Sequence, residues 1–185
     1  THLDREIIDN CIKENKHPKF NKAFPEGMKY FQIDDVKEAI AGSDMIIGGV
    51  SSFGVDWFGK EMLPKIPVEI PVLSVTKGLV CLDDGRLICY PEYWAGFDGG
   101  KHEICAIGGP CTSYELVAED QTVVSFCGKN MQTLCMMKRA MATDYYHVNV
   151  TCDVMGIESA VALKNGYALG VAFSIGACKR IYGEE

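Results

Sequence analysis

Apolar and polar positions along the first part of the chain predict helices and strands in turn. Over residues 3–13, apolar side chains recur at helical spacing and Pro18 then ends the pattern, so we expect a helix followed by a loop. The stretch 28–33 (MKYFQI) is typical of a short strand. Two aspartates follow it and suit the start of a helix over residues 36–42.

Continuous apolar runs then alternate with segments of helical pattern. A run such as MIIGGV, with a helix before it and serines after it, is typical of a parallel strand that is buried on both faces. The expected strands are MIIGGV (45–50), VLSV (72–75), EICAIGG (103–109), TVVSF (122–126) and HVNV (147–150), and the expected helices cover 57–63, 113–118 and 130–141. This alternation predicts a mostly parallel, doubly wound sheet.

The last segment, residues 153–180, is small or apolar at almost every position. Such a helix is expected to be surrounded by protein on every side. Because Glu158 and Lys164 interrupt it, we predict a buried core helix and no membrane span. The chain stops at Glu185 without a partner for this helix and begins at Thr1 within a helical pattern, so we expect an internal piece of a longer protein.

Composition excludes several classes of protein. The chain has 185 residues, with 25 acidic against 18 scattered basic residues and a net charge of -7, which argues against a nucleic-acid-binding surface. Its nine cysteines are odd in number and include no C-x-x-C, so neither a disulfide framework nor a zinc site is expected. No basic-then-apolar leader precedes the first helix. We therefore expect a reducing, cytoplasmic compartment.

The ends of the predicted strands are the places to search for a site, because ligands of open α/β sheets collect at the carboxyl ends of the strands. Lys77 follows VLSV after one threonine, and its ammonium either binds an anionic group or extends from the strand end into solvent. Gly109 and Pro110 follow the next strand. They either let a ligand approach the main chain or form only a turn.

Lys164 is the stronger candidate, because an unpaired ammonium in the middle of an apolar helix is costly. Burial lowers the pKa of such a lysine or demands a partner for it. Glu158 precedes it by six positions and points to a different side of the helix, so an ordinary ion pair within the helix is excluded. Lys164 is therefore either functional or a structural charge, and Asn165 beside it shares the argument more weakly.

Four segments resemble motifs of the NAD(P)-dependent glycerol-3-phosphate dehydrogenases. HPKF (17–20) is similar to their N-P-R-Y, and SVTKGL (74–79) to their strand ending in T/I-K-G. GGPCTSYEL (108–116) is similar to their G-P-S-F-A-x-E-V, and the segment 153–176 to their D-x-x-G-x-E-x-x-x-A-L-K-N-x-x-A-x-x-x-G. Their order and spacing agree along nearly the whole chain.

This resemblance implies a reaction and a set of site residues. Dihydroxyacetone phosphate and glycerol 3-phosphate would be interconverted, with a hydride from NAD or NADP and a proton from Lys164. The implied catalytic residues are Lys164 and Lys77; the substrate-binding residues are Lys77, Gly109, Cys111 and Asn165; the cofactor-binding residues are Phe20, Ser51, Phe58, Lys77 and Ser113. The implied ligand is a small phosphorylated substrate, with no metal, and the resemblance allows a homodimer.

Some positions depart from the family pattern. The expected V-P-S-H turn is VSSFGVDW (50–57), Cys111 to Ser113 replace S-F-A, and no G-x-G-x-x-G is present. These departures leave two alternatives open. One is a related dehydrogenase for another small anionic substrate, and the other is a catalytically inactive homologue that acts as a nucleotide-binding or regulatory module.

The expected architecture is thus α/β. Residues 1–150 are predicted to form a Rossmann-like NAD(P)-binding domain with a doubly wound, mostly parallel sheet that lacks its first βα unit. Residues 151–185 are predicted to be the first long helix of an α-helical substrate domain. By itself this chain is expected to be inactive.

Overall fold

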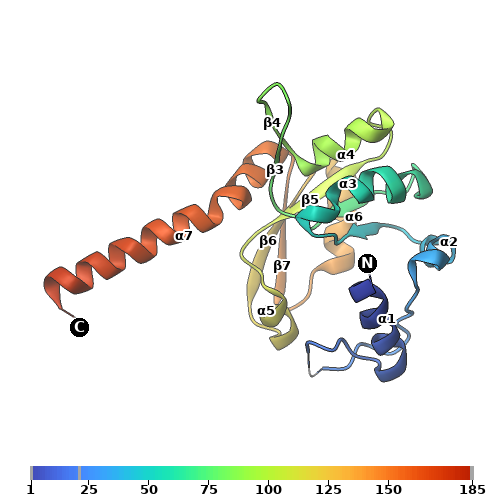
Figure 1. Cartoon of the computed structure of the whole chain (residues 1–185), viewed down its shortest axis with the longest axis horizontal. Coiled ribbons are helices and arrows are strands. Elements are labelled where there is room, and N and C mark those ends of the chain that lie inside the picture. Colours follow the sequence, from blue (N-terminus) through green and yellow to red (C-terminus); the bar gives the residue numbers. More distant parts are fainter. Residues whose placement is uncertain (1, 21, 184–185) are drawn as a thin grey trace.

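The computed structural model describes residues 2–20 and 22–183, and its centre is a five-stranded sheet. In spatial order the strands are β1 (Ile46–Gly48), β2 (Val72–Ser74), β5 (Ile104–Gly108), β6 (Thr122–Cys127) and β7 (Tyr146–Thr151). All neighbours pair in parallel except β5 and β6, which are antiparallel. The mostly parallel α/β sheet predicted from the sequence is therefore confirmed, with one antiparallel pair inside it (Figure 1).

Helices of very different length connect these strands. They are α1 (His2–Glu14), α2 (Val36–Ile40), α3 (Val55–Trp57) continued by a π-turn (Phe58–Met62), α4 (Tyr90–Asp98), α5 (Ser113–Ala118), α6 (Met131–Met141) and α7 (Val154–Tyr182), with 3-10 turns at Ile33–Asp35, Ser52–Gly54 and Leu63–Lys65. The strands β3 (Leu79–Cys81) and β4 (Leu87–Cys89) form a separate antiparallel hairpin. This hairpin and α4 were not predicted.

The strand predicted at 28–33 is wrong. That stretch pairs with no other strand, and side chains attach it to α1 and to the loop after α1. The Tyr30 hydroxyl donates to Asn15 Oδ1 at 2.6 Å, and the Gln32 amide donates to Asp9 Oδ1 at 2.8 Å. Side-chain contacts, and not a ladder of backbone hydrogen bonds, therefore hold this stretch in place.

Both faces of the central strands β2 and β5 are covered, which explains their continuous apolar runs. Val72 in β2 packs into a cluster that also holds Phe58 and Trp94, whereas the next residue, Leu73, packs into a cluster on the opposite face with Leu134 of α6. Helices therefore lie against the sheet from two sides, as in a three-layer α/β domain.

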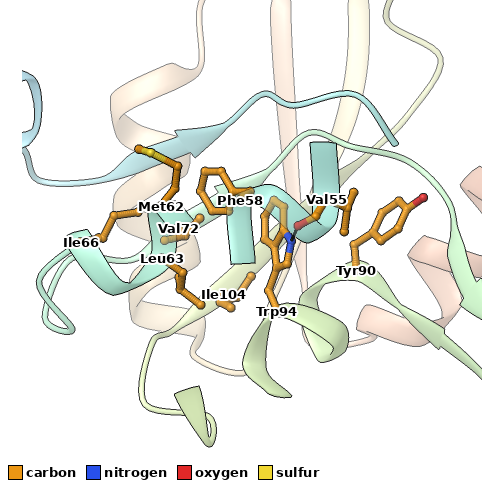
Figure 2. Packing of buried hydrophobic residues seen from close by; sticks show 9 residues of the cluster. All are labelled: Val55, Phe58, Met62, Leu63, Ile66, Val72, Tyr90, Trp94 and Ile104. Carbon is orange, nitrogen blue, oxygen red and sulfur yellow. Dashed lines mark hydrogen bonds between the residues drawn. The ribbon is translucent and has the colours of Figure 1, made fainter. Parts of the chain in front are cut away.

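Trp94 is the centre of the first cluster, shown in Figure 2. Its side chain is fully buried and stacks on Phe58 with ring centroids 4.3 Å apart, and its indole Nε1 donates to the Val55 carbonyl at 2.9 Å. A Cβ on Gly48 would lie 2.9 Å from the Trp94 ring, so β1 can pass under this ring only as glycine. The indole thus joins α3, α4 and β1.

Helix α7 departs from the prediction, because it is buried only near its start. From Ala162 onward nearly every residue is exposed, and Figure 1 shows the helix projecting away from the sheet. With 29 residues it is about 43 Å long, whereas the strands that it crosses have at most six residues, about 20 Å. The sheet is too short to cover it. By length and composition alone, α7 would also suffice to cross a membrane.

Replacing Trp94 with alanine is expected to lower the free energy of unfolding by about 3–5 kcal/mol, because it removes a fully buried indole and leaves the Val55 carbonyl without its donor. Urea unfolding measures the change. Trp57→Ala is the matched control, since Trp57 is 43% exposed. Equal losses in the two variants would contradict the central place of Trp94.

Candidate functional site

The carboxyl ends of β2 and β5 lie side by side and carry the residues predicted for a site. One cavity, of about 430 Å³, is lined by Lys77, Gly109, Cys111 and Ser113 among others. A second, of about 380 Å³, is lined by Gly109 and Lys164. Gly108 and Gly109 border both cavities, which adjoin the end of β5 from its two faces. We call these two cavities together the lysine crevice.

A glycine of unusual backbone conformation follows each of these two strands at the crevice. Gly78 and Gly109 have φ angles of +142° and +143°, a conformation that side chains disfavour. A Cβ on Gly109 would also lie 3.0 Å from the Val123 carbonyl oxygen. The main chain at Gly109 is therefore fixed, and its carbonyl accepts a hydrogen bond from Lys77 Nζ at 3.1 Å. This bond holds the lysine across the crevice.

Electrostatics at Lys77 are unusual for an exposed lysine. Desolvation by the surrounding protein lowers the pKa of its ammonium, and the positive charge of Lys164 lowers it further. The Cys111 thiol and the Glu158 carboxyl act in the opposite direction and raise the pKa. The charge on Lys164 therefore affects the protonation of Lys77.

Helix α5 brings Cys111 and Ser113 to the crevice. Its first turn is fixed by a capping box, in which Thr112 Oγ1 accepts from the Glu115 amide at 3.3 Å and the Thr112 amide donates to Glu115 Oε2 at 2.7 Å. Cys111, just before this cap, is half-buried, and Ser113, the first helical residue, is exposed. Both line the cavity around Lys77.

The residues predicted near the cofactor lie in different places. Phe20 makes an edge-to-face contact with Tyr114 of α5, with centroids 5.4 Å apart, and so lies one residue from Ser113 along that helix. Ser51 is exposed after β1 but borders neither cavity. Phe58 lies in the core against Trp94, so its ring faces the sheet and not the crevice.

Lys164 reaches the crevice, but not as a buried lysine. It lines the cavity beside Gly109, yet it is exposed, as is Asn165 after it. The expectation that a surrounding core would desolvate Lys164 is therefore wrong for this structure, because α7 leaves the sheet at about this point. Desolvation instead lowers the pKa of Lys77.

Glu158 is a buried acid that the sequence did not single out for a role. It is 0% exposed, and neither carboxylate oxygen has a hydrogen-bond partner. Burial raises its pKa to about 7, against a smaller lowering effect of the charge on Lys77. The D-x-x-G-x-E spacing contains this residue, but only the fold shows that it lies inside the protein.

A third cavity of about 490 Å³, larger than either of these two, lies at the opposite end of β5. Residues of α4, the loop before β5 and the first turn of α7 line it, and it includes neither Lys77 nor Lys164. We place the site at the lysine crevice because Lys77 and Lys164 line it. Within residues 2–20 and 22–183, no cluster of three or more histidine, cysteine or acidic side chains is arranged to hold a metal.

An open, mainly parallel α/β sheet with a crevice at the carboxyl ends of its strands is the architecture of Rossmann-type domains. The sequence model of the NAD-dependent glycerol-3-phosphate dehydrogenase N-terminus matches residues 2–134, and the chain therefore belongs to this family. The family predicted from the four motifs is thus confirmed.

Individual relatives agree with this assignment. The NADP(+)-dependent glycerol-3-phosphate dehydrogenase of Archaeoglobus fulgidus is 27% identical over 173 residues, which are 94% of this chain and 51% of the relative. The crystal structure of glycerol-3-phosphate dehydrogenase from Coxiella burnetii matches with a TM-score of 0.76 at 25% identity, over 86% of this chain and 48% of that one. The enzyme from Plasmodium falciparum, at 18% identity and a TM-score of 0.76, covers 86% of this chain and 44% of its own and supports the fold alone. The chain spans about half the length of these relatives.

Gly109→Ala is expected to lower the free energy of unfolding by about 1–3 kcal/mol, because alanine disfavours this φ angle and its Cβ would press on the backbone of β6. Thermal unfolding provides the measurement. Gly85→Ala is the control, since Gly85 also has positive φ but open space around it. A loss no greater than that of the control would show that the contact with β6 is unimportant.

Glu158→Gln is expected to stabilise the chain above neutral pH. The pKa of Glu158 is about 7 in the fold and near 4.5 in the unfolded chain, so the folded state binds more protons between these values. Wild-type stability therefore falls as pH rises from about 4.5 to 7, by about 3 kcal/mol at most, and glutamine removes this loss. Urea unfolding at pH 5 and pH 8 measures it. The difference in unfolding free energy between Glu158→Gln and the wild type should grow from pH 5 to pH 8. If it grows no more than for the exposed change Glu69→Gln, the raised pKa of Glu158 is disproved.

Proposed function

We propose that this chain forms the nicotinamide and substrate end of a glycerol-3-phosphate dehydrogenase that uses NAD or NADP. The reaction would be the reversible reduction of dihydroxyacetone phosphate to glycerol 3-phosphate. The observation that carries the proposal is the lysine crevice, in which Lys77 and Lys164 line neighbouring cavities that share Gly108 and Gly109, and the charge on Lys164 lowers the pKa of Lys77. The relatives' names support the substrate, since the proteins of Archaeoglobus fulgidus and Leptospira biflexa are both glycerol-3-phosphate dehydrogenases.

The residues at this edge of the sheet fit part of a nicotinamide dinucleotide. After β1 the main chain is open to solvent, because a Cβ on Gly49 would meet nothing closer than Val75 at 3.9 Å. The Thr76 hydroxyl donates to the Val50 carbonyl at 2.6 Å and fixes this turn to the end of β2. Residues that would hold the cofactor are Phe20, Ser51, Lys77 and Ser113, while Phe58 supports the sheet from the core. When bound, the cofactor supplies the hydride.

The two lysines would divide the remaining work. Lys77, held by the Gly109 carbonyl, directs its other N–H groups toward an anionic or carbonyl oxygen of the substrate. Lys164 gives a proton to the carbonyl oxygen as it becomes an alkoxide and takes it back in the reverse direction. Exposure of Lys164 to solvent lets the proton be replaced. Cys111 and Asn165 border the same space and would contact the substrate.

Compartment and assembly remain predictions. All nine cysteines are free thiols, which supports a reducing compartment such as the cytoplasm. A homodimer is compatible with the family.

Lys164→Met is expected to lower kcat by about two to four orders of magnitude, since methionine keeps the apolar stem and removes the proton. Lys77→Ala should raise the KM for dihydroxyacetone phosphate, lower kcat, or both. The assay needs a chain of the relatives' full length that carries these residues. Lys65→Met, at an exposed position away from the crevice, serves as the control.

Near-normal kcat in a folded Lys164→Met enzyme would remove Lys164 from proton transfer. No turnover even in the unaltered full-length protein, together with retained nucleotide binding, would favour the inactive homologue that the altered turn at 50–57 allows. Turnover with a different phosphorylated or carboxylated substrate would favour the related dehydrogenase.

A further inference from the structure

The loop after α1 contacts both ends of the short helix α5. At the first turn of α5, Phe20 packs edge to face on Tyr114, with ring centroids 5.4 Å apart. Just after the last turn, the Lys22 ammonium forms an ion pair with the Glu119 carboxylate, and it also donates a hydrogen bond to the Val117 carbonyl at 3.3 Å. Lys22 and Glu119 are 97 residues apart in the sequence. A distant segment of the chain thus holds α5 at its two ends.

This loop is itself closed at its base. The Phe24 amide donates to the Asn15 carbonyl at 2.8 Å, and the Asn15 side-chain amide donates to the Phe24 carbonyl at 3.1 Å. The Tyr30 hydroxyl adds a third hydrogen bond, to Asn15 Oδ1. Phe20 and Lys22 therefore extend toward α5 from a fixed base.

Helix α5 needs contacts of this kind, because it has only six residues and a helix of that length is not stable by itself. The amides of Glu119 and Asp120 donate back into its last turn at 3.2 and 3.0 Å, as in a Schellman motif. Glu119 has a φ angle of +61°, which residues other than glycine rarely adopt. In this conformation its carboxylate meets Lys22, which also binds the Val117 carbonyl at the helix end.

Residues of α5 and its cap form one wall of the cavity around Lys77. Thr112, Ser113 and Leu116 line that cavity, whereas Lys22 borders neither cavity of the lysine crevice. A shift of α5 would move this wall as a unit. Lys22 can therefore influence the shape of the cavity only through α5.

We propose that Lys22 is a positioning residue, which holds α5 through Glu119 and Val117 so that the wall of the crevice is ordered before the nicotinamide cofactor binds. This inference rests on the proposed function, which assigns Phe20 and Ser113 to the cofactor. When the pair is broken, part of the binding free energy is spent on ordering α5, and the affinity for the cofactor falls.

A general structural role would have a different signature. The side chains of Lys22 and Glu119 are 54% and 53% exposed, and ion pairs in such positions contribute little to the stability of the whole fold. Loss of the pair should consequently change the order of α5 and the affinity for the cofactor, while the unfolding temperature stays nearly constant.

Hydrogen exchange of this chain, followed by NMR, tests the effect on α5. In Lys22→Met the amides of Glu119 and Asp120 should exchange about two- to fivefold faster, the range that an exposed ion pair allows. Lys22→Arg keeps the cation and should keep the slow exchange. Lys29→Met, at another exposed lysine, is the control and should change nothing at α5. Unchanged exchange in folded Lys22→Met would overturn the inference.

Titration with NADH and with NADPH, followed by the fluorescence of the reduced nicotinamide, tests the effect on the cofactor in a protein of the relatives' full length. Lys22→Met and Glu119→Gly should each bind the preferred cofactor about two- to fivefold more weakly, with kcat at saturating cofactor unchanged. Glycine favours the φ angle of residue 119, so Glu119→Gly should not lower the unfolding temperature. Weaker binding by this variant cannot then result from a loss of stability.

The outcomes separate this inference from the proposed function. Unaltered cofactor affinity in both variants would overturn the inference and leave the proposed function standing. If Lys22→Arg binds the cofactor as weakly as Lys22→Met, the ion pair is not responsible, and the inference is likewise overturned. Absence of cofactor binding to the unaltered full-length protein would overturn both.

Discussion

The close approach of α7 to β5 at Gly108 is the contact on which the site depends. A Cβ at this position would lie 2.9 Å from Val161 Cγ2 and would also overlap Ile157, so any side chain here would push the helix off the sheet. With glycine, the first turns of α7 lie directly on the strand. The same contact brings Lys164 to the crevice and buries Glu158, so the positions of both side chains depend on the absence of a side chain at residue 108.

The sequence predicted those parts of the fold that local pattern determines. Strands β2 and β5 follow from continuous apolar runs, since both of their faces are covered, whereas β7 alternates buried and exposed residues. The hairpin of β3 and β4 is short and lies outside this sheet, and the aromatic residues of α4 do not repeat at clear helical spacing. The false strand at 28–33 has the right composition but is held by side chains from α1 and its following loop. Such long-range contacts cannot be read from one sequence.

The candidate site was predictable to a similar degree. The rule that ligands gather at carboxyl ends of strands, together with the family motifs, named Lys77, Gly109, Cys111, Ser113 and Lys164, and the fold brings these together. Burial was predicted less well. An apolar helix suggested that Lys164 is covered, and Glu158 was given no role, whereas the structure buries the acid and exposes the lysine. What decides this is how far the sheet extends under α7, and that depends on strand lengths far away in sequence.

The antiparallel pairing of β5 with β6 has a consequence for chain geometry. Because β7 runs parallel to β6, it ends far from the crevice, and α7 must travel back along the sheet to reach it. β7 has six residues and spans about 20 Å, while the eleven residues from Asp153 to Lys164 rise about 17 Å as a helix. The helix therefore returns over nearly the whole length of β7. The number of residues between the acidic cap and the lysine in the D-x-x-G-x-E-x-x-x-A-L-K pattern is therefore matched to the length of the preceding strand. Adding or removing one residue in the strand or in this part of the helix would rotate or displace the ammonium relative to the crevice.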